Sequence, residues 1–594
     1  MSNLLIVLLA VPLATAIVVA LLGTQRLDAV RWLSLAATIV CLVGAVVVAV
    51  SSLPLLIAHD ASTYQPEFVP GSTPDRPHAT TWDLVPLQQT VADGQTKSAA
   101  IQFFLGIDGV NIWLIVLTTL LMVSSVLISW TAITERPHEF YAWLLALETS
   151  MLGVFLSFDI ILFYFFFELT LVPLFFLIGI WGGPQRQYAA RKFFIFTLAG
   201  SLITLLGVLG IVLTLSQKTF GGELTFSLPE LVARVEKFNT ELPQKVVAER
   251  TAVAAAAQDN QAVEVARSQL KQAEDRLAFW QRVQFWVFVG MMVGFAVKVP
   301  LVPLHTWLPL AHVEAPTAGS VLLAGVLLKI GTYGFLRLCV PLAPDASLSF
   351  GAPLLASLAV IGVLYGSLCA LAQDDVKKLV AYSSVAHLGF CILGLFALNE
   401  VGLTGSLLVM INHGLSTGAL FLLVGMLYER YHTRRMADYG GLAARLKLLA
   451  LFWVFIAMTS IGLPGLNGFW GELSVLMGMA DFQGSQVHGW VLTVLASLGV
   501  VLGAWYMLTL LRRVFFGEVK EPAHEGHGPI LDLGLRELAA LVPIAVVCVA
   551  LGVYPRPFLD SVAPDLKKVV RLADNARDRA GRQLDVRQLA TREE

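Results

Sequence analysis

The stretch KVPLVPLHTWLPLAHVEAPTAGSVLLAGVLLKIGTYGFLR, residues 298–337, decides how this chain folds. Its first part carries Pro300, Pro303 and Pro309 within an apolar run. A proline frees backbone carbonyl groups, which inside a membrane need polar partners or water. Two lysines, Lys298 and Lys329, stand in the same apolar sequence. The stretch therefore predicts an interrupted membrane helix followed by a helix with a buried charge.

The composition around this stretch is that of a membrane protein. The chain has 594 residues, of which 57% are hydrophobic and 14% are charged, against about 25% charged in soluble domains. Apolar runs of about 20 residues recur, and each can cross a bilayer core of about 30 Å as a helix. We expect an all-α polytopic membrane protein with about 14 spans: 4–23, 32–52, 107–133, 141–157, 160–181, 193–215, 284–309, 318–341, 352–372, 379–398, 402–427, 446–479, 488–511 and 538–555.

Lysines and arginines are distributed unequally between alternate loops. The loops that follow odd-numbered spans are rich in them, for example Arg430, Arg434 and Arg435, whereas the short loops on the other side are poor. Cytoplasmic loops carry this excess in membrane proteins. We therefore expect both termini on the outer side, with residues 4–23 retained as the first span.

Three segments do not fit a plain bundle. Residues 53–100 are rich in Pro, Asp, Gln and His and indicate an outside loop. Residues 229–283 contain an Ala-rich, charge-balanced stretch that predicts a solvated helix or hairpin on the outer face, with Pro243 as a helix break before it. Residues 557–594 are polar and indicate an outside tail. The expected organisation is 1–134 for spans 1–3, 141–341 and 352–511 for two larger units, 538–555 for the last span, and the tail.

A second span also looks interrupted. The run 446–479 is too long for one straight span, and Pro464, Gly465, Gly468 and Gly471 cluster near its middle. If spans 4–8 and 9–13 form two five-helix units, each interruption falls in the fourth helix of its unit. An odd number of helices makes the two units inverted, and broken helices at matching positions point to a path through the membrane.

Charged residues near span centres are rare and costly, about 3 kcal/mol each on insertion scales. Nevertheless several ionisable residues lie in apolar surroundings in this chain. The candidates for proton transfer are Glu168, Lys298, Lys329, His387, His413 and Glu472, with Glu148 as a weaker one.

These groups can carry protons because burial pushes both lysine and glutamate toward their neutral forms, while a nearby opposite charge restores the ionised forms. A Glu168–Lys298 pair whose separation changes is therefore a proton switch, and the two would titrate as a coupled pair. His387 and His413 suit a relay between other groups.

Structural interpretations compete with this one. Glu168 and Lys298 could form a static ion pair, the histidines could be hydrogen-bonded core residues, and Glu472 could cap the second half of its broken helix. His305, His312 and Glu314, near the junction of spans 7 and 8, have an ordinary solvated role as a strong alternative.

At these residues the sequence resembles a known family. Residues 298–337, FFFELTLVPLFFLIGIWG (165–182), KKLVAYSSVAHLGF (377–390) and GLPGLNGFWGE (462–472) are similar to the antiporter-like subunits of proton-pumping NADH:quinone oxidoreductase (respiratory complex I) and of Mrp-type antiporters. The resemblance implies two inverted five-helix repeats, a polar axis, and proton roles for the same candidates. Relatives usually carry lysine at the position of Glu472, so this glutamate favours the subunit M branch.

The resemblance also implies a division of labour. Electron transfer, with FMN, iron–sulfur clusters and quinone, would lie in partner subunits of a bacterial inner-membrane complex, and this chain would contact neighbouring antiporter-like subunits and lipid. The five cysteines stand singly, which argues against an iron–sulfur or zinc site here. The alternatives are a subunit of an Mrp-type antiporter or a membrane-bound hydrogenase, and a non-conducting assembly scaffold.

Overall fold

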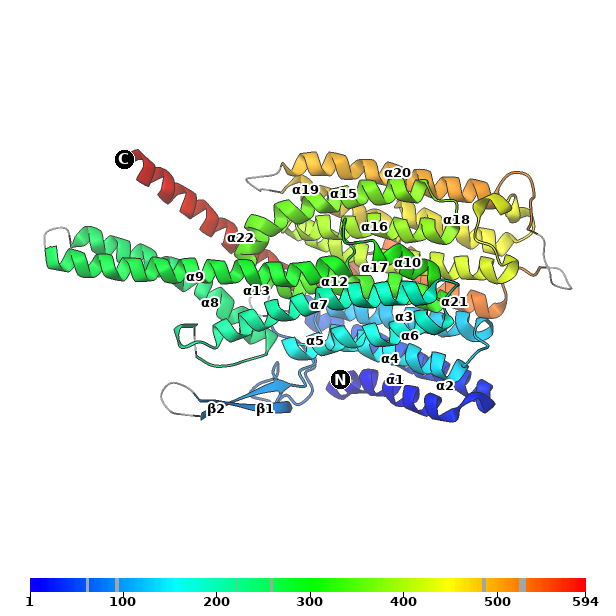
Figure 1. The fold of residues 1–594 in the computed structure, drawn as a ribbon, viewed down its shortest axis with the longest axis horizontal. Helices are drawn as coiled ribbons and strands as arrows, with labels where there is room; N and C mark the ends of the chain where they lie inside the picture. Colours follow the sequence, from blue (N-terminus) through cyan, green and yellow to red (C-terminus); the bar gives the residue numbers. More distant parts are fainter. Residues whose placement is uncertain are drawn as a thin grey trace.

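The computed structural model describes residues 1–59, 64–90, 96–220, 222–256, 260–482, 488–522 and 530–593, and shows a bundle of long, roughly parallel and antiparallel helices (Figure 1). The bounds of its first half are α1 Ser2–Leu22, α2 Leu27–Ile57, α3 Asn111–Ala132, α4 Pro137–Leu156, α5 Ile160–Leu169, α6 Leu171–Trp181, α7 Arg186–Leu215, α8 Leu228–Ala255, α9 Asn260–Lys298 and α10 Trp307–Glu314. Those of the second half are α11 Thr317–Leu322, α12 Leu328–Gly334, α13 Val340–Leu342, α14 Pro344–Ala346, α15 Ala352–Leu371, α16 Val376–Leu395, α17 Glu400–Tyr431, α18 Lys447–Ile461, α19 Asn467–Ala480, α20 Gly489–Phe515, α21 Leu535–Val553 and α22 Arg556–Glu593.

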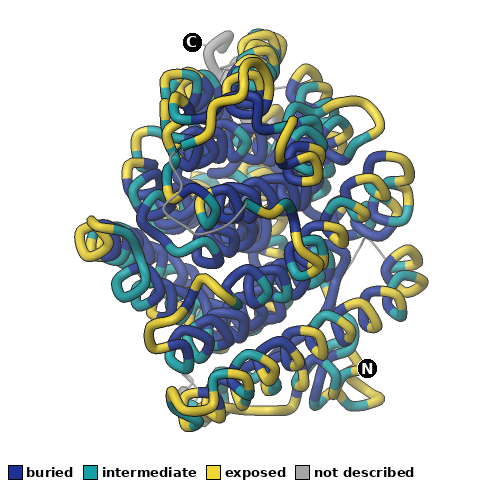
Figure 2. The backbone as a smooth tube through the Cα atoms, turned by 90° about the vertical axis from the view of Figure 1, so that its right-hand side faces the viewer, coloured by how far each residue is buried: buried dark blue, intermediate teal, exposed yellow. Residues whose placement is uncertain are grey.

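Twelve helical segments of the described chain are long and apolar enough to cross a membrane. They match twelve of the predicted spans, and the other two predicted spans are the interrupted ones, each divided between two helices. The predicted all-α polytopic fold is confirmed. Figure 2 shows the burial expected of such a bundle, with buried residues inside and exposed residues on the periphery.

Both predicted interruptions are present, and both follow from proline and glycine. Helix α9 ends at Lys298, and the backbone leaves the helix until Trp307, across Pro300 and Pro303. Helix α18 ends at Ile461 and is followed by Gly462, whose φ of +78° is accessible to glycine without strain, and α19 begins at Asn467. In each unit the broken helix packs against the third helix, α9 on α7 and α19 on α17.

Two further irregularities were not predicted. The fifth span is divided at Thr170 into α5 and α6, because Pro173 has no N–H for the carbonyl of Leu169. In the eighth span, π-helical turns at Leu323–Leu327 and Phe335–Cys339 flank Lys329. Such turns open the backbone hydrogen-bond ladder, and they are frequent at functional sites.

The segments outside the bundle are more ordered than predicted. The predicted loop 53–100 contains the end of α2 and most of a hairpin of β1 (Asp83–Thr90) and β2 (Thr96–Gln102), while 60–63 and 91–95 lie outside the described residues. The predicted insert is a helical hairpin of α8 and α9 that extends from one end of the bundle (Figure 1), with 257–259 outside the described residues. The prediction that Pro243 breaks the helix was wrong, since α8 runs through it.

The tail, expected only as a polar segment, is the long helix α22. Its apolar stripe packs on α2, α13, α14 and α17, at the end of the bundle where the α8–α9 hairpin also lies. The buried residues of this stripe are Phe558, Val562, Leu566, Val569, Leu572 and Ala576. The stripe was missed because the charged face of an amphipathic helix lowers the average hydropathy of its sequence.

Candidate functional site

The centre of the candidate site is a contact between Lys329 and His413. Both side chains are buried, with exposed fractions of 0% and 3%. The Nζ of Lys329 lies 2.6 Å from Nδ1 of His413 and also donates to the carbonyl of Ala324, in the first π-helical turn. Because Lys329 stands on α12 and His413 on α17, the contact joins the two five-helix units.

This contact is the start of a row of neighbouring ionisable side chains, which consists of Lys329, His413, His387 and Glu472. The rings of His413 and His387 lie 5.6 Å apart between centroids. Nδ1 of His387 lies 3.4 Å from Oε1 of Glu472, and its Nε2 lies 3.4 Å from Oγ of Ser460. The row therefore brings together four of the predicted residues, which stand in this order on α12, α17, α16 and α19.

Glu472 is positioned by the interruption before its helix. The α18–α19 connection folds back so that Gly462 faces the carboxylate, and a Cβ atom at Gly462 would lie 2.9 Å from Oε2 of Glu472. The side chain lies at the sixth position of α19, in the second turn. It contacts a histidine rather than the free backbone N–H groups of the helix start, which distinguishes it from a simple helix cap.

Lys298 and Glu168 form a second part of the site. The Nζ of Lys298 donates to Oγ1 of Thr170 at 3.3 Å and lies 4.5 Å from the ring centroid of Phe167. Glu168 is half-buried. The static ion pair with Lys298, which was one of the structural alternatives, is absent from the described residues, although the two charges act on each other. Lys298 therefore contacts the break between α5 and α6 rather than the carboxylate next to it.

Glu148 is separate from both parts. Its side chain is completely buried on α4, and neither carboxylate oxygen makes a hydrogen bond to the described residues. Its charge acts on the thiol of Cys41 on α2. The structure does not bring this weaker candidate together with the others.

The alternative of a solvated role for His305, His312 and Glu314 was wrong. All three are buried, and the ring of His312 stacks on Phe421 at 4.6 Å between centroids. His312 is close enough to Lys329 for their charges to interact, which adds a histidine to the neighbourhood of the row. Its place in the short α10, directly after the proline-rich break, was the available signal in the sequence.

Comparisons with known proteins show the family of the chain. A family model described as "NADH:quinone oxidoreductase/Mrp antiporter, TM" matches residues 157–249 and 263–503. The NADH-quinone oxidoreductase subunit M of Rhodobacter capsulatus is 37% identical over 578 residues, 96% of this chain and 97% of the relative. Subunit M of Pseudomonas aeruginosa is 40% identical over 475 residues, 79% of this chain and 82% of the relative.

Solved structures show the same architecture. A chain of respiratory complex I from Thermus thermophilus superposes with a TM-score of 0.70 at 28% identity, covering 96% of this chain and 99% of that one. A chain of the Mrp complex from Dietzia, at 20% identity and a TM-score of 0.67, covers 96% of this chain and 97% of its own, and shares the fold. This chain therefore belongs to the NADH:quinone oxidoreductase/Mrp antiporter transmembrane family, among its subunit M members.

Proposed function

We propose that this chain translocates protons as a membrane subunit of a NADH:quinone oxidoreductase, respiratory complex I. One observation carries the proposal, namely the row of neighbouring side chains from Lys329 through His413 and the half-buried His387 to Glu472. Uncompensated ionisable groups inside a membrane are costly, and they persist where they bind or move ions.

The chemistry of the first and last contacts of the row supports proton transfer. Between Lys329 and His413, one hydrogen bond at 2.6 Å joins an ammonium, which only donates, to an imidazole, which accepts when neutral. A proton can therefore pass from Nζ to Nδ1 without a large movement. His387 then presents Nδ1 to Glu472, whose carboxylate accepts a proton when the histidine is charged.

Lys298 and Glu168 would load and control this row. With Thr170 as its hydrogen-bond partner, Lys298 is held near the carboxylate but not against it. A small movement of α5 relative to α9 would change the distance between the two charges, and with it the affinity of Lys298 for a proton. Glu148 is the weakest member of the proposed set because it stands apart from the row.

The cellular setting follows from the relatives. The proposed partners are the other membrane subunits of the complex, including neighbouring antiporter-like subunits, and the proposed location is the bacterial inner membrane with both termini outside. Electron transfer, with its flavin, iron–sulfur clusters and quinone, would take place in partner subunits, and the row would respond to it. Among the described residues of this chain, no group of three metal-ligating side chains gathers.

The proposal predicts that Lys298→Ala and Glu168→Ala each abolish proton pumping. Inverted membrane vesicles that hold the assembled complex would be given NADH, and proton uptake would be followed with a fluorescent dye. Lys378→Ala, which removes an exposed lysine on α16, is the matched control and should pump normally. Normal pumping by the Lys298 and Glu168 variants, at wild-type assembly, would contradict the proposed roles and favour a scaffold.

A further inference from the structure

A buried ion pair closes one end of the eighth span. Arg337 and Asp108 are 3% and 4% exposed, and the guanidinium binds both carboxylate oxygens, with Nη2 lying 2.8 Å from Oδ1. The same carboxylate accepts hydrogen bonds from the backbone N–H groups of Val110 and Asn111. The pair is therefore electrically neutral as a unit, and it ties the start of α3 to the end of the eighth span.

The remaining donors of Arg337 reach two tyrosines. Nε donates to the hydroxyl of Tyr333 at 3.0 Å, and Nη1 donates to the hydroxyl of Tyr64 at 3.2 Å. Three aromatic rings surround the guanidinium, those of Phe158 and Tyr333 at 5.0 Å and that of Tyr64 at 5.6 Å. Such a site holds the cation firmly and leaves little room for water.

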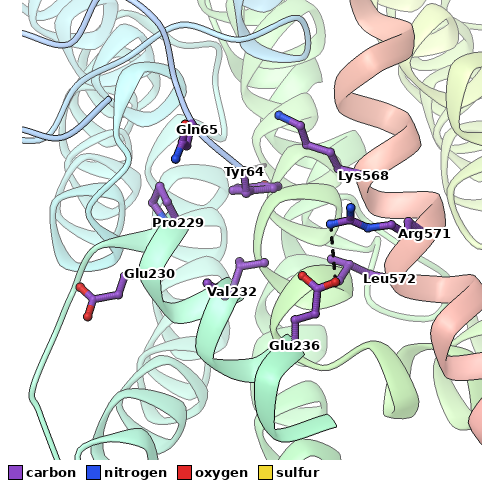
Figure 3. A pocket seen from close by; sticks show the side chains of 10 residues that line it. Tyr64, Gln65, Pro229, Glu230, Val232, Glu236, Lys568, Arg571 and Leu572 are labelled. Carbon is purple, nitrogen blue, oxygen red and sulfur yellow. Dashed lines mark ion pairs between the residues drawn. The ribbon is translucent and has the colours of Figure 1, made fainter. Parts of the chain in front are cut away.

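Arg337 lies between the row and a cavity. Lys329, Tyr333 and Arg337 follow one another at four-residue spacing, so they lie near one face of the helix, and Arg337 is about 12 Å from Lys329 along the axis. On its other side, Tyr64 lines a cavity of about 330 Å³ together with Lys568 and Arg571 (Figure 3). A second and much smaller gap, of about 10 Å³, is lined by Arg337, Tyr64 and Asp565, among others, and Tyr64 is shared with the larger cavity.

This arrangement looks like a relay, but its central member cannot conduct. A tyrosine hydroxyl can accept one proton and release another, whereas a guanidinium has no acceptor and stays protonated at physiological pH. We propose that Arg337, held by Asp108, is a seal that prevents protons on Lys329 from leaving through this end of the span, so that they pass to His413. The inference rests on the proposed function, because only a proton-carrying row needs a seal.

The test replaces the insulating group by a conducting one. The assembled complex would be reconstituted into liposomes, a pH gradient would be imposed without NADH, and its decay would be followed with a pH-sensitive dye. Arg337→His places a group that can relay protons between the tyrosines, and a several-fold faster decay is expected. Arg337→Met removes the same contacts to Asp108 but cannot relay, and decay at the wild-type rate is expected. Adding Lys329→Ala to Arg337→His should restore the wild-type rate.

Each alternative result has a distinct meaning. Decay at the wild-type rate in Arg337→His would overturn the seal, and so would equal leaks in the His and Met variants, which would show a packing defect. If Arg337→His fails to assemble, Asp108→Asn/Arg337→His leaves no unpaired buried carboxylate and is expected to leak in the same way. The proposed function fails separately, namely if Lys329→Ala alone pumps protons like the wild type.

Discussion

The Nζ of Lys329 and Nδ1 of His413 lie 2.6 Å apart, 84 positions apart in the sequence, across the boundary between the two five-helix units. Lys329 also donates to the carbonyl of Ala324, which lies in the first π-helical turn, where the backbone hydrogen-bond pattern departs from that of an α-helix. The irregular backbone of the eighth span thus positions the lysine for transfer into the second unit.

His413→Gln should therefore interrupt the proposed path at its centre. Glutamine retains hydrogen bonding to Lys329, but its amide does not take up a proton, so pumping is expected to fall at least tenfold while assembly persists. Proton uptake by vesicles after NADH addition measures the effect, and blue native electrophoresis measures assembly. Pumping above half the wild-type rate would show that the path bypasses His413.

Thr170 is expected to position Lys298. Thr170→Val removes the hydroxyl that accepts a hydrogen bond from Lys298 but keeps the shape of the side chain. Loss of this hydrogen bond costs about 1 kcal/mol, or about a fivefold change in the equilibrium between the bound and released positions of Lys298. A two- to fivefold loss of pumping is expected. Thr170→Ser keeps the hydroxyl and is the control, and equal losses in the two variants would exclude the hydrogen bond as the cause.

Gly462 is expected to shape the environment of Glu472. In Gly462→Ala the new Cβ would lie 2.9 Å from Oε2 of Glu472 and would displace the carboxylate from His387. Gly465→Ala is a matched control, because its φ of +90° gives similar backbone strain, about 1 kcal/mol, with open space around the Cβ. Pumping should fall several-fold only in Gly462→Ala. An equal loss of pumping in both variants would show that backbone strain, and not the displacement of Glu472, is the cause.

Asp565 should hold α22 on the bundle. Burial alone would raise the pKa of this carboxyl group, but its hydrogen bond to His59 and the charge of Lys568 outweigh burial and lower the pKa to about 2. In turn, the hydrogen bond to Asp565 raises the pKa of His59. Asp565→Asn breaks the cluster and should reduce the local stability of α22 by about 3 kcal/mol, measured as faster hydrogen exchange over residues 560–576.

The two shifts also predict how the attachment of α22 depends on pH. The carboxyl group of Asp565, whose pKa is lowered, stabilises the folded state fully when the pH is above the ordinary pKa of a carboxyl group. This stabilisation is lost only as the pH falls toward 2. His59, whose pKa is raised, stabilises the folded state fully when the pH is below the ordinary pKa of histidine. This stabilisation is lost as the pH rises through the raised pKa. Exchange rates corrected for intrinsic pH dependence should therefore increase above neutral pH in the wild type, and stay flat in His59→Gln. An increase between pH 6 and pH 4 instead would contradict this assignment.

Much of the architecture was predictable because it depends on local chemistry. Apolar runs identify the spans. Pro300 and Pro303, and Pro464 with its neighbouring glycines, identify the two broken helices, since clustered prolines and glycines weaken a helix locally. The break at Thr170 and the two π-helical turns were not predictable in this way. They reflect a balance between the helix and its packing partners, which one proline or a pattern of hydrophobic residues does not settle.

The sequence by itself determined that several ionisable groups, Lys298 and Lys329 among them, stand within long apolar runs, where a charge is costly and has little access to water. Only the tertiary structure decided which of them meet. Helix rotation and crossing place Lys329 against His413, leave Glu148 alone, and join Arg337 to Asp108, 229 positions away. These pairings depend on the orientation of one helix face relative to another, and that is a property of the packed bundle rather than of any segment within it.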